Sequence, residues 1–113
     1  MFVVDTNILL YAVNPDSPDH DAARTLVDRW RREDRSWFLT WGIIYEFLRV
    51  STHQKVFASP LDLPRAQAWI EALRRGLERR PATELPPLPV YNMGRERVDL
   101  SNRDALYAAM EGD

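Results

Sequence analysis

Three carboxylates in separate parts of the chain are the side chains best suited to carry chemistry. Asp5 follows the apolar run of residues 2–4, which reads as a buried strand. Glu46 and Asp104 lie beside apolar stretches with helical spacing. Ligands of an open parallel sheet bind beyond the carboxyl ends of its strands, where side chains from separate segments can meet. Three such carboxylates would hold Mg²⁺ or Mn²⁺, and the cation would activate water and stabilise charge on a phosphodiester.

Each carboxylate also has an ordinary structural role open to it. Asp5 fits the N-cap of a helix that begins directly after it. Glu46 stands three residues before Arg49, the spacing of an ion pair within a helix. Asp104 stands three residues after Ser101, the spacing of a capping box. Capping does not prevent a carboxylate from binding metal, so the pattern leaves both roles open.

The sequence lacks the residues that zinc binding, aspartate-based phosphatase chemistry, nucleotide binding and serine hydrolysis require. The chain has no cysteine, and His20 and His53 share no ligand spacing, so we expect both histidines at the surface and no zinc site. A phosphatase of the haloacid dehalogenase type needs a second aspartate two residues after the first, but Asn7 occupies that position and cannot transfer a proton. Neither a Gly-rich phosphate loop nor a Gly-x-Ser-x-Gly motif is present.

Apolar periodicity and capping residues place these side chains on a few short elements. The patterns predict strands at residues 2–4 and 37–39, and helices over 6–13, 17–30, 41–54, from 64 onward, and 101–110. The order of strands and helices predicts an α/β fold with a parallel sheet. Four prolines make residues 81–100 irregular, with a short strand considered at Val90-Tyr91.

Composition predicts a single domain over residues 1–113. The chain contains neither an apolar run of about 20 residues nor a signal-peptide pattern, so we expect a cytoplasmic protein without membrane association. Although the net charge is −2, basic residues predominate over residues 36–80. A basic middle between acidic ends can place a phosphate-attracting surface beside the carboxylates, or can be ordinary solvated surface. The four tryptophans indicate a dense core or an apolar surface for a partner.

Three segments carry motifs in a recognisable order. Residues 3–12, VVDTNILLYA, combine an apolar strand, Asp-Thr-Asn and an apolar helix that ends in Tyr-Ala. Residues 40–50, TWGIIYEFLRV, carry a glutamate on a helix. Residues 100–109, LSNRDALYAA, follow a Leu-Ser-x-x-Asp-Ala-Leu-x-Ala-Ala pattern. Together these segments resemble the PIN-domain family, especially the VapC-type toxins of toxin–antitoxin pairs.

The resemblance implies a three-layer α/β/α sandwich with a small parallel sheet, and an Mg²⁺- or Mn²⁺-dependent endoribonuclease that acts as the toxin of such a pair. It also implies RNA as substrate, a cognate VapB-type antitoxin and a homodimer. The catalytic metal ligands that it implies are Asp5, Glu46 and Asp104. Asn7 and Thr40 would support the site by hydrogen bonds, and Arg49 would contact Glu46 or phosphate.

The chain departs from the family pattern after its third motif. Family members continue with a further strand and a fourth acidic residue, but Asp113 follows Asp104 too closely to be that residue. We therefore expect the C-terminal segment of the family to be missing here. This departure supports an alternative function, in which a catalytically impaired PIN remnant acts by binding an antitoxin or a dimer partner.

Overall fold

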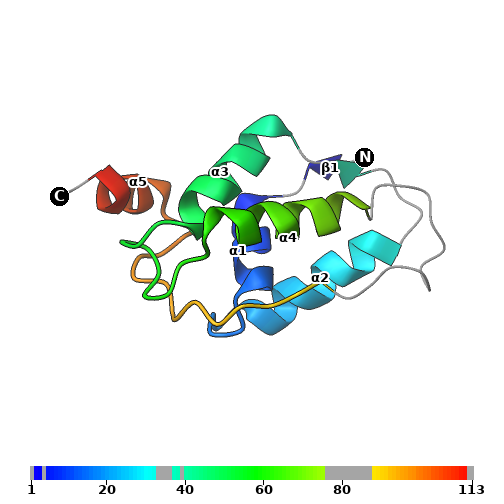
Figure 1. Cartoon of the computed structure of the whole chain (residues 1–113), viewed down its shortest axis with the longest axis horizontal. Coiled ribbons are helices and arrows are strands. Elements are labelled where there is room, and N and C mark those ends of the chain that lie inside the picture. The colour runs from blue at the N-terminus through cyan, green and yellow to red at the C-terminus, as the bar shows by residue number, and fades with distance from the viewer. Residues whose placement is uncertain (1, 4, 33–36, 39, 76–87, 112–113) are drawn as a thin grey trace.

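The computed structural model describes residues 2–3, 5–32, 37–38, 40–75 and 88–111, which form five helices and two short strands in an elongated molecule of 46 × 25 × 25 Å (Figure 1). The elements are β1 (Phe2–Val3), α1 (Thr6–Val13), α2 (His20–Arg32), β2 (Trp37–Phe38), α3 (Trp41–Ser51), α4 (Leu63–Arg75) and α5 (Arg103–Glu111). The strands pair in parallel, with Phe2 opposite Trp37 and Val3 opposite Phe38.

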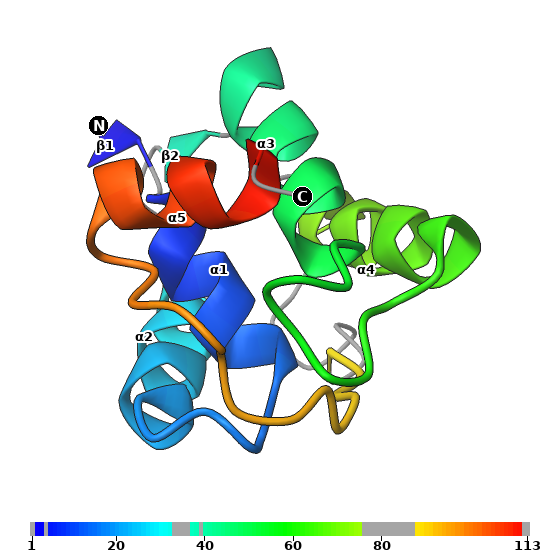
Figure 2. The ribbon, with the colours of Figure 1, turned by 90° about the vertical axis from the view of Figure 1, so that its left-hand side faces the viewer.

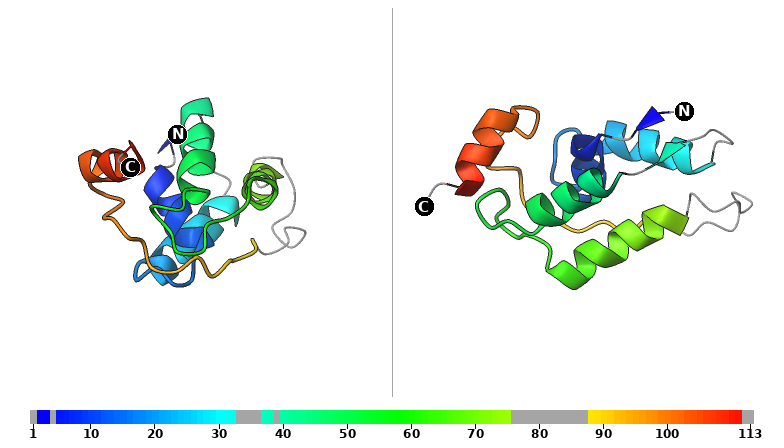
Figure 3. Two further views of the ribbon diagram at one scale, coloured as in Figure 1. Left: turned by 60° about the vertical axis from the view of Figure 1, so that its left-hand side comes forward. Right: turned by 90° about the horizontal axis from the view of Figure 1, so that it is seen from above.

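Helix α1 lies at the centre of the molecule and packs against both α2 and α3. Its sequence, TNILLYAV, contains no charged residue, and a helix that is apolar on most of its circumference needs neighbours on more than one side. The side chains that α1 buries are Thr6, Leu9, Leu10, Ala12 and Val13. Helices α2 and α4 lie on either side of the α1–α3 pair (Figure 3), so the four helices form one packed group.

Helix α4 joins this group through α3. The ring of Phe47 on α3 stacks on Trp69 of α4, with centroids 5.0 Å apart and ring planes 15° from parallel. The indole N–H of Trp69 donates to the carbonyl oxygen of Pro89 at 3.0 Å, so the buried ring has its polar group satisfied. The predicted apolar face of α4 is confirmed for the residues described, which are Ala66, Trp69, Ile70 and Leu73; Leu77 lies outside the described residues.

The irregular segment 88–100 is held to the end of α1 by one buried amide. The side-chain N–H of Asn14 donates to the carbonyl oxygen of Gly94 at 2.8 Å, and its side-chain oxygen accepts from the backbone N–H of Met93 at 3.1 Å. Gly94 has a φ of 81°, and a Cβ there would lie 3.1 Å from the Cβ of Ala58. A side chain at this position would therefore meet both a backbone penalty and a close contact.

The predicted three-layer α/β/α sandwich is wrong for the part of the chain that the structure describes. Two strands of two residues each give the sheet no face wide enough to carry helices on both sides. The third strand considered at Val90-Tyr91 does not form, because the Tyr91 N–H donates to the Val13 carbonyl oxygen at the end of α1 (2.9 Å). The helices bury their apolar faces mainly against one another instead.

The predicted helices are present, with boundaries shifted by a few residues. Helix α2 begins at His20 because the Ser17 hydroxyl accepts from the N–H of Asp19 (3.3 Å) in a turn that precedes it. Helix α3 ends at Ser51, where the Thr52 hydroxyl donates back to the Leu48 carbonyl oxygen at 2.7 Å. Strand positions 4 and 39 and Pro-rich residues 81–87 lie outside the described residues. None of the described helices is long and apolar enough to cross a membrane.

The role of Asn14 leads to a prediction about stability. Replacing Asn14 with alanine removes the partners of the Met93 N–H and the Gly94 carbonyl oxygen, and we expect the free energy of unfolding to fall by about 3 kcal/mol. Asn92→Ala is the matched control, because its exposed amide donates only to Asp16 (3.0 Å) and its loss should cost less than about 1 kcal/mol. Urea unfolding measures both, and equal losses in the two variants would contradict the role given to Asn14.

Candidate active site

Asp5 caps the N-terminus of α1. Its backbone is extended (φ −77°, ψ 138°), and one carboxylate oxygen accepts the backbone N–H of Asn7 at 3.1 Å. The structural role that the sequence left open for Asp5 is thereby confirmed. The side chain is 60% exposed, so capping leaves most of the carboxylate available to a ligand.

Helix α3 supplies the second carboxylate. Its N-cap is Thr40, whose hydroxyl oxygen accepts the N–H of Ile43 at 3.1 Å. Glu46 follows further along the helix, and its side chain is only 21% exposed. Both residues face the same open cavity of about 460 Å³, which is lined by Asp5, Thr6, Thr40, Gly42, Ile43, Glu46 and Arg103. The short parallel strands explain this meeting, since β1 leads to Asp5 and β2 leads to Thr40.

Arg103, the first residue of α5, links the two carboxylates. One guanidinium nitrogen donates to Glu46 Oε1 at 2.6 Å, and the other lies 3.9 Å from Asp5 Oδ1. The first of these nitrogens also lies 3.0 Å from the hydroxyl oxygen of Tyr107, one turn further along α5. Figure 2 shows α5 across the end of the molecule, beside α1 and α3. A cation from a third segment therefore occupies the place between the two carboxylates.

The surroundings of Arg103 keep it charged. Its hydrogen bonds with Tyr107 and Glu46 raise the pKa of the guanidinium above its ordinary value. A positive charge in the first turn of a helix is unfavourable with the helix dipole. The carboxylates of Asp5 and Glu46 offset that cost, and the guanidinium in turn reduces the repulsion between them.

Asp104 does not line this cavity. It is exposed in the first turn of α5, and the predicted capping box with Ser101 is wrong. The side-chain oxygen of Asn102 accepts the N–H of Ala105 at 3.0 Å, whereas the Ser101 hydroxyl donates to Asp99 at 2.6 Å. Helix α5 consequently starts at residue 103, which directs Arg103 rather than Asp104 to the other two carboxylates.

The described residues, arranged in this way, do not fit a three-carboxylate cation site. Two carboxylates face the cavity, and a guanidinium lies between them. Over the ranges that the structure describes, no group of three or more acidic, histidine or cysteine residues is close enough to hold a metal ion. The geometry is that of an acidic pair, open to solvent, whose charge one guanidinium offsets in part.

The residues predicted to support the site make the following contacts. Asn7 contributes its backbone N–H to Asp5. The Arg49 guanidinium carbon lies 6.0 Å from the ring centre of Tyr107, and among the described contacts Arg49 forms no ion pair with Glu46.

The two histidines are half-buried rather than at the surface, and neither lines the cavity. Nδ1 of His20 lies 2.9 Å from the Tyr11 carbonyl oxygen.

The sequence patterns do not indicate Arg103 and Tyr107 as site residues. The spacing predicts a partner for Glu46 within its own helix, at Arg49, but the partner comes from α5 through a tertiary contact. One signal was present, because Arg103 and Tyr107 are four residues apart and therefore share a helix face. Arg103, at the start of that face, is the residue through which the third motif contacts Asp5 and Glu46 of the first two motifs.

Comparisons with known proteins agree with the motifs. No protein-family model matches the sequence. The chain is 37% identical over 57 residues to Ribonuclease VapC48 of Mycobacterium tuberculosis. The aligned region covers 50% of this chain and 39% of that protein. It is 33% identical over 73 residues to Ribonuclease VapC31 of the same species, covering 65% of this chain and 51% of the relative. The same identity and length relate it to VapC ribonuclease Mb2897 of Mycobacterium bovis.

These matches confirm the resemblance to VapC-type ribonucleases that the motifs indicated. The chain spans about half the length, or less, of these relatives.

The two roles of Asp5 can be separated by substitution. Asparagine caps helices as well as aspartate does, so we expect Asp5→Asn to change the free energy of unfolding by less than about 0.5 kcal/mol. Asp5→Ala removes the bond to the Asn7 N–H and should cost about 1 kcal/mol. Urea unfolding of both variants makes the comparison. If Asp5→Asn destabilises as much as Asp5→Ala, then α1 depends on the charge of Asp5 and not on its hydrogen bond.

Proposed function

We propose that this chain is a VapC-type endoribonuclease that hydrolyses RNA phosphodiester bonds and acts as the toxin of a toxin–antitoxin pair. The proposal includes a requirement for Mg²⁺ or Mn²⁺, which are the ions suited to carboxylate oxygens. Its proposed catalytic residues are Asp5 and Glu46, whose carboxylates line the cavity and would hold the cation. A cognate VapB-type antitoxin and a second copy of the chain are the proposed partners.

The observation that carries this proposal is that Asp5 and Glu46, from two motifs that resemble those of VapC-type proteins, face one open cavity. Asp5 caps α1 near the end of β1, and Thr40 caps α3, the helix that carries Glu46, near the end of β2. Structural ion pairs at a surface contribute about 0–1 kcal/mol, so stability alone gives little reason for this arrangement. Its exposure to solvent instead supports a role in ligand binding.

The residues around the carboxylates can recognise a phosphodiester. Two carboxylates alone would repel a phosphate group, but Arg103 places a guanidinium beside them with 47% of its side chain exposed. A guanidinium offers paired N–H donors that match phosphate oxygens. The Thr40 cap fixes the start of α3 and therefore the position of Glu46 relative to Asp5.

A second candidate function is binding without catalysis. Arg103 fills the place between the carboxylates, and Asp104 does not line the cavity, which are the features expected of a PIN remnant that only binds an antitoxin or a second copy. The two functions differ in whether the folded chain cleaves RNA.

Cleavage assays test the proposal directly. We expect the purified chain to cleave a mixed tRNA and rRNA pool in Mg²⁺ or Mn²⁺, and EDTA to abolish cleavage. Asp5→Asn and Glu46→Gln should each lower the rate at least 100-fold, since each removes a charge from the cavity while preserving side-chain shape. Asp62→Asn is the matched control. Asp62 accepts an N–H in the first turn of α4 at 2.9 Å and is absent from the cavity lining, so its rate should not change.

Cleavage that persists in Asp5→Asn would contradict the assigned site. A folded chain that binds RNA or a partner but never cleaves would favour the binding function instead.

A metal-binding experiment tests the position of Arg103 without relying on activity. We expect Arg103→Gln to tighten Mn²⁺ binding about three- to tenfold, because a cation bound between Asp5 and Glu46 must displace the guanidinium. Arg97→Gln removes the same charge from an exposed arginine whose guanidinium donates to the Gln54 carbonyl oxygen (3.3 Å) away from this cavity, and should leave affinity unchanged. Electron paramagnetic resonance of free Mn²⁺ measures both. Equal affinity in wild type and Arg103→Gln would show that the cation does not bind between these carboxylates.

A further inference from the structure

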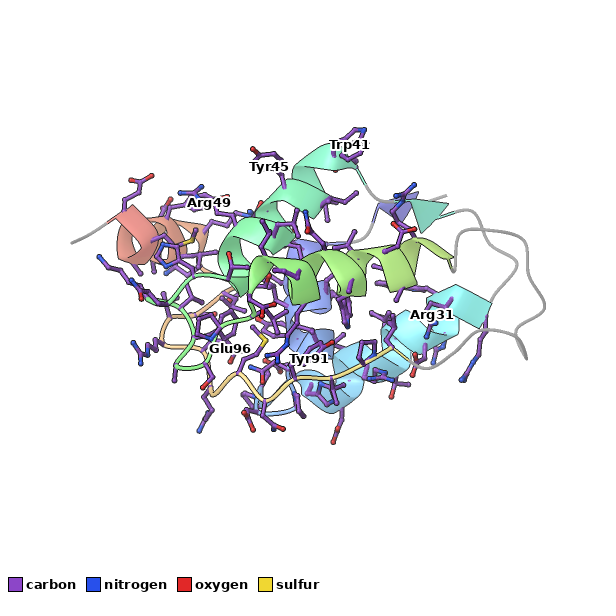
Figure 4. The ribbon with its side chains drawn as sticks, viewed as in Figure 1. Arg31, Trp41, Tyr45, Arg49, Tyr91 and Glu96 are labelled. Atoms are coloured by element: carbon purple, nitrogen blue, oxygen red, sulfur yellow. The ribbon has the colours of Figure 1, made fainter. Side chains whose placement is uncertain are left out.

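Two large aromatic side chains project into solvent from one helix. Trp41 is 81% exposed and Tyr45 is 75% exposed, whereas other residues of α3, including Phe47 and Val50, are fully buried. Figure 4 shows Trp41 and Tyr45 pointing away from the packed helices along the same edge of α3, with Arg49 further along the helix. We call these three residues the aromatic strip.

The spacing of the aromatic strip aligns it with the helix axis. Its members are four residues apart, which places them on one face at intervals of about 6 Å. The guanidinium carbon of Arg49 lies 6.0 Å from the ring centre of Tyr107, the residue whose hydroxyl contacts Arg103. The strip therefore ends in a cation that is connected with the cluster at the cavity.

The aromatic strip lies on the helix that also lines the cavity, although none of its three residues lines the cavity itself. Gly42 and Ile43, directly after Trp41, line the cavity together with Glu46, directly after Tyr45. The strip and Glu46 share one helix and therefore have a fixed relative position.

The strip is too narrow to be an apolar interface of ordinary size. Aromatic side chains bury roughly 150–250 Å² each, so two of them provide less than the roughly 800 Å² per partner of a standard interface. The other large hydrophobic residues that the structure shows exposed are Leu63 and Val90, and neither lies on α3. A row of two separate rings that ends in a cation better fits a ligand with flat groups along a charged backbone.

We propose that the aromatic strip binds single-stranded RNA, with two bases stacked on Trp41 and Tyr45 and a phosphate on Arg49. This inference rests on the proposed function and specifies the form of the substrate. Every base offers a flat face for stacking on an aromatic ring, so the strip tolerates different sequences. The bases of a duplex are already stacked on one another, so a helical RNA offers the rings no free face. The positive charge of Arg49 complements the RNA backbone.

Equilibrium binding to a fluorescein-labelled single-stranded RNA of 12 nucleotides, in EDTA to prevent cleavage, tests the inference. We expect Trp41→Ala and Tyr45→Ala each to weaken binding about tenfold, and Trp41→Phe and Tyr45→Phe to retain most of the affinity because they keep a ring. Arg49→Gln should reduce the slope of log K against log salt by about 0.7. Leu63→Ala is the control, since it removes an exposed apolar side chain from α4 and should not change the affinity. Circular dichroism checks that every variant is folded.

Several outcomes would overturn the inference. One is unchanged RNA affinity in both alanine variants, and another is equal affinity of the wild type for the single strand and a hairpin duplex. If Trp41→Ala instead converts a dimer to a monomer in sedimentation without affecting RNA binding, the strip contacts a second copy. Cleavage by the wild-type chain, assayed in parallel with Mg²⁺, separates the two proposals. Cleavage with unaffected binding in the variants rejects only the aromatic strip, whereas a wild type that neither binds nor cleaves RNA rejects the proposed function as well.

Discussion

The structure depends on closing both ends of one buried helix. Helix α1 is central, eight residues long and without charge, so the N–H and carbonyl groups at its ends need partners from outside the helix. Asp5 satisfies an N–H at the first end. At the other end, the Val13 carbonyl oxygen accepts the Tyr91 N–H, and Asn14 binds the backbone of residues 93 and 94. One end thus places a carboxylate at the candidate active site, and the other fixes the segment that leads to α5.

The route from that segment to α5 brings a third charge to the site. Because α5 begins at Arg103, a guanidinium meets Glu46 at 2.6 Å and approaches Asp5, while Asp104 remains exposed outside the cavity. A shift in the start of a helix by one residue rotates its side chains by about 100°. The local contacts of Asp99 and Asn102 therefore decide which charge the acidic pair receives.

Helix α3 has three faces, of which one is buried in the core, one lines the cavity and one is exposed to solvent. Phe47 and Val50 are buried, and Phe47 stacks on Trp69 of α4. Glu46 and Ile43 face the cavity, and Trp41 and Tyr45 face solvent. One helix of 11 residues thereby joins the core, the carboxylates and an exposed aromatic surface, so the spacing between core and cavity is set by helix geometry alone.

The sequence by itself determined the helices and the cap at Asp5, because these follow from local periodicity and capping residues, and it predicted that Asp5 and Glu46 lie close together. It also indicated the likeness to VapC-type proteins through short ordered motifs. It did not determine the layers of the fold or the partner of Glu46. The sandwich failed because two-residue strands cannot carry two helical layers, a property of length that apolar runs do not reveal. The pairing with Arg103 and the exposure of Trp41 beside the burial of Trp69 were decided by tertiary packing, since these positions differ in neighbours and not in residue type.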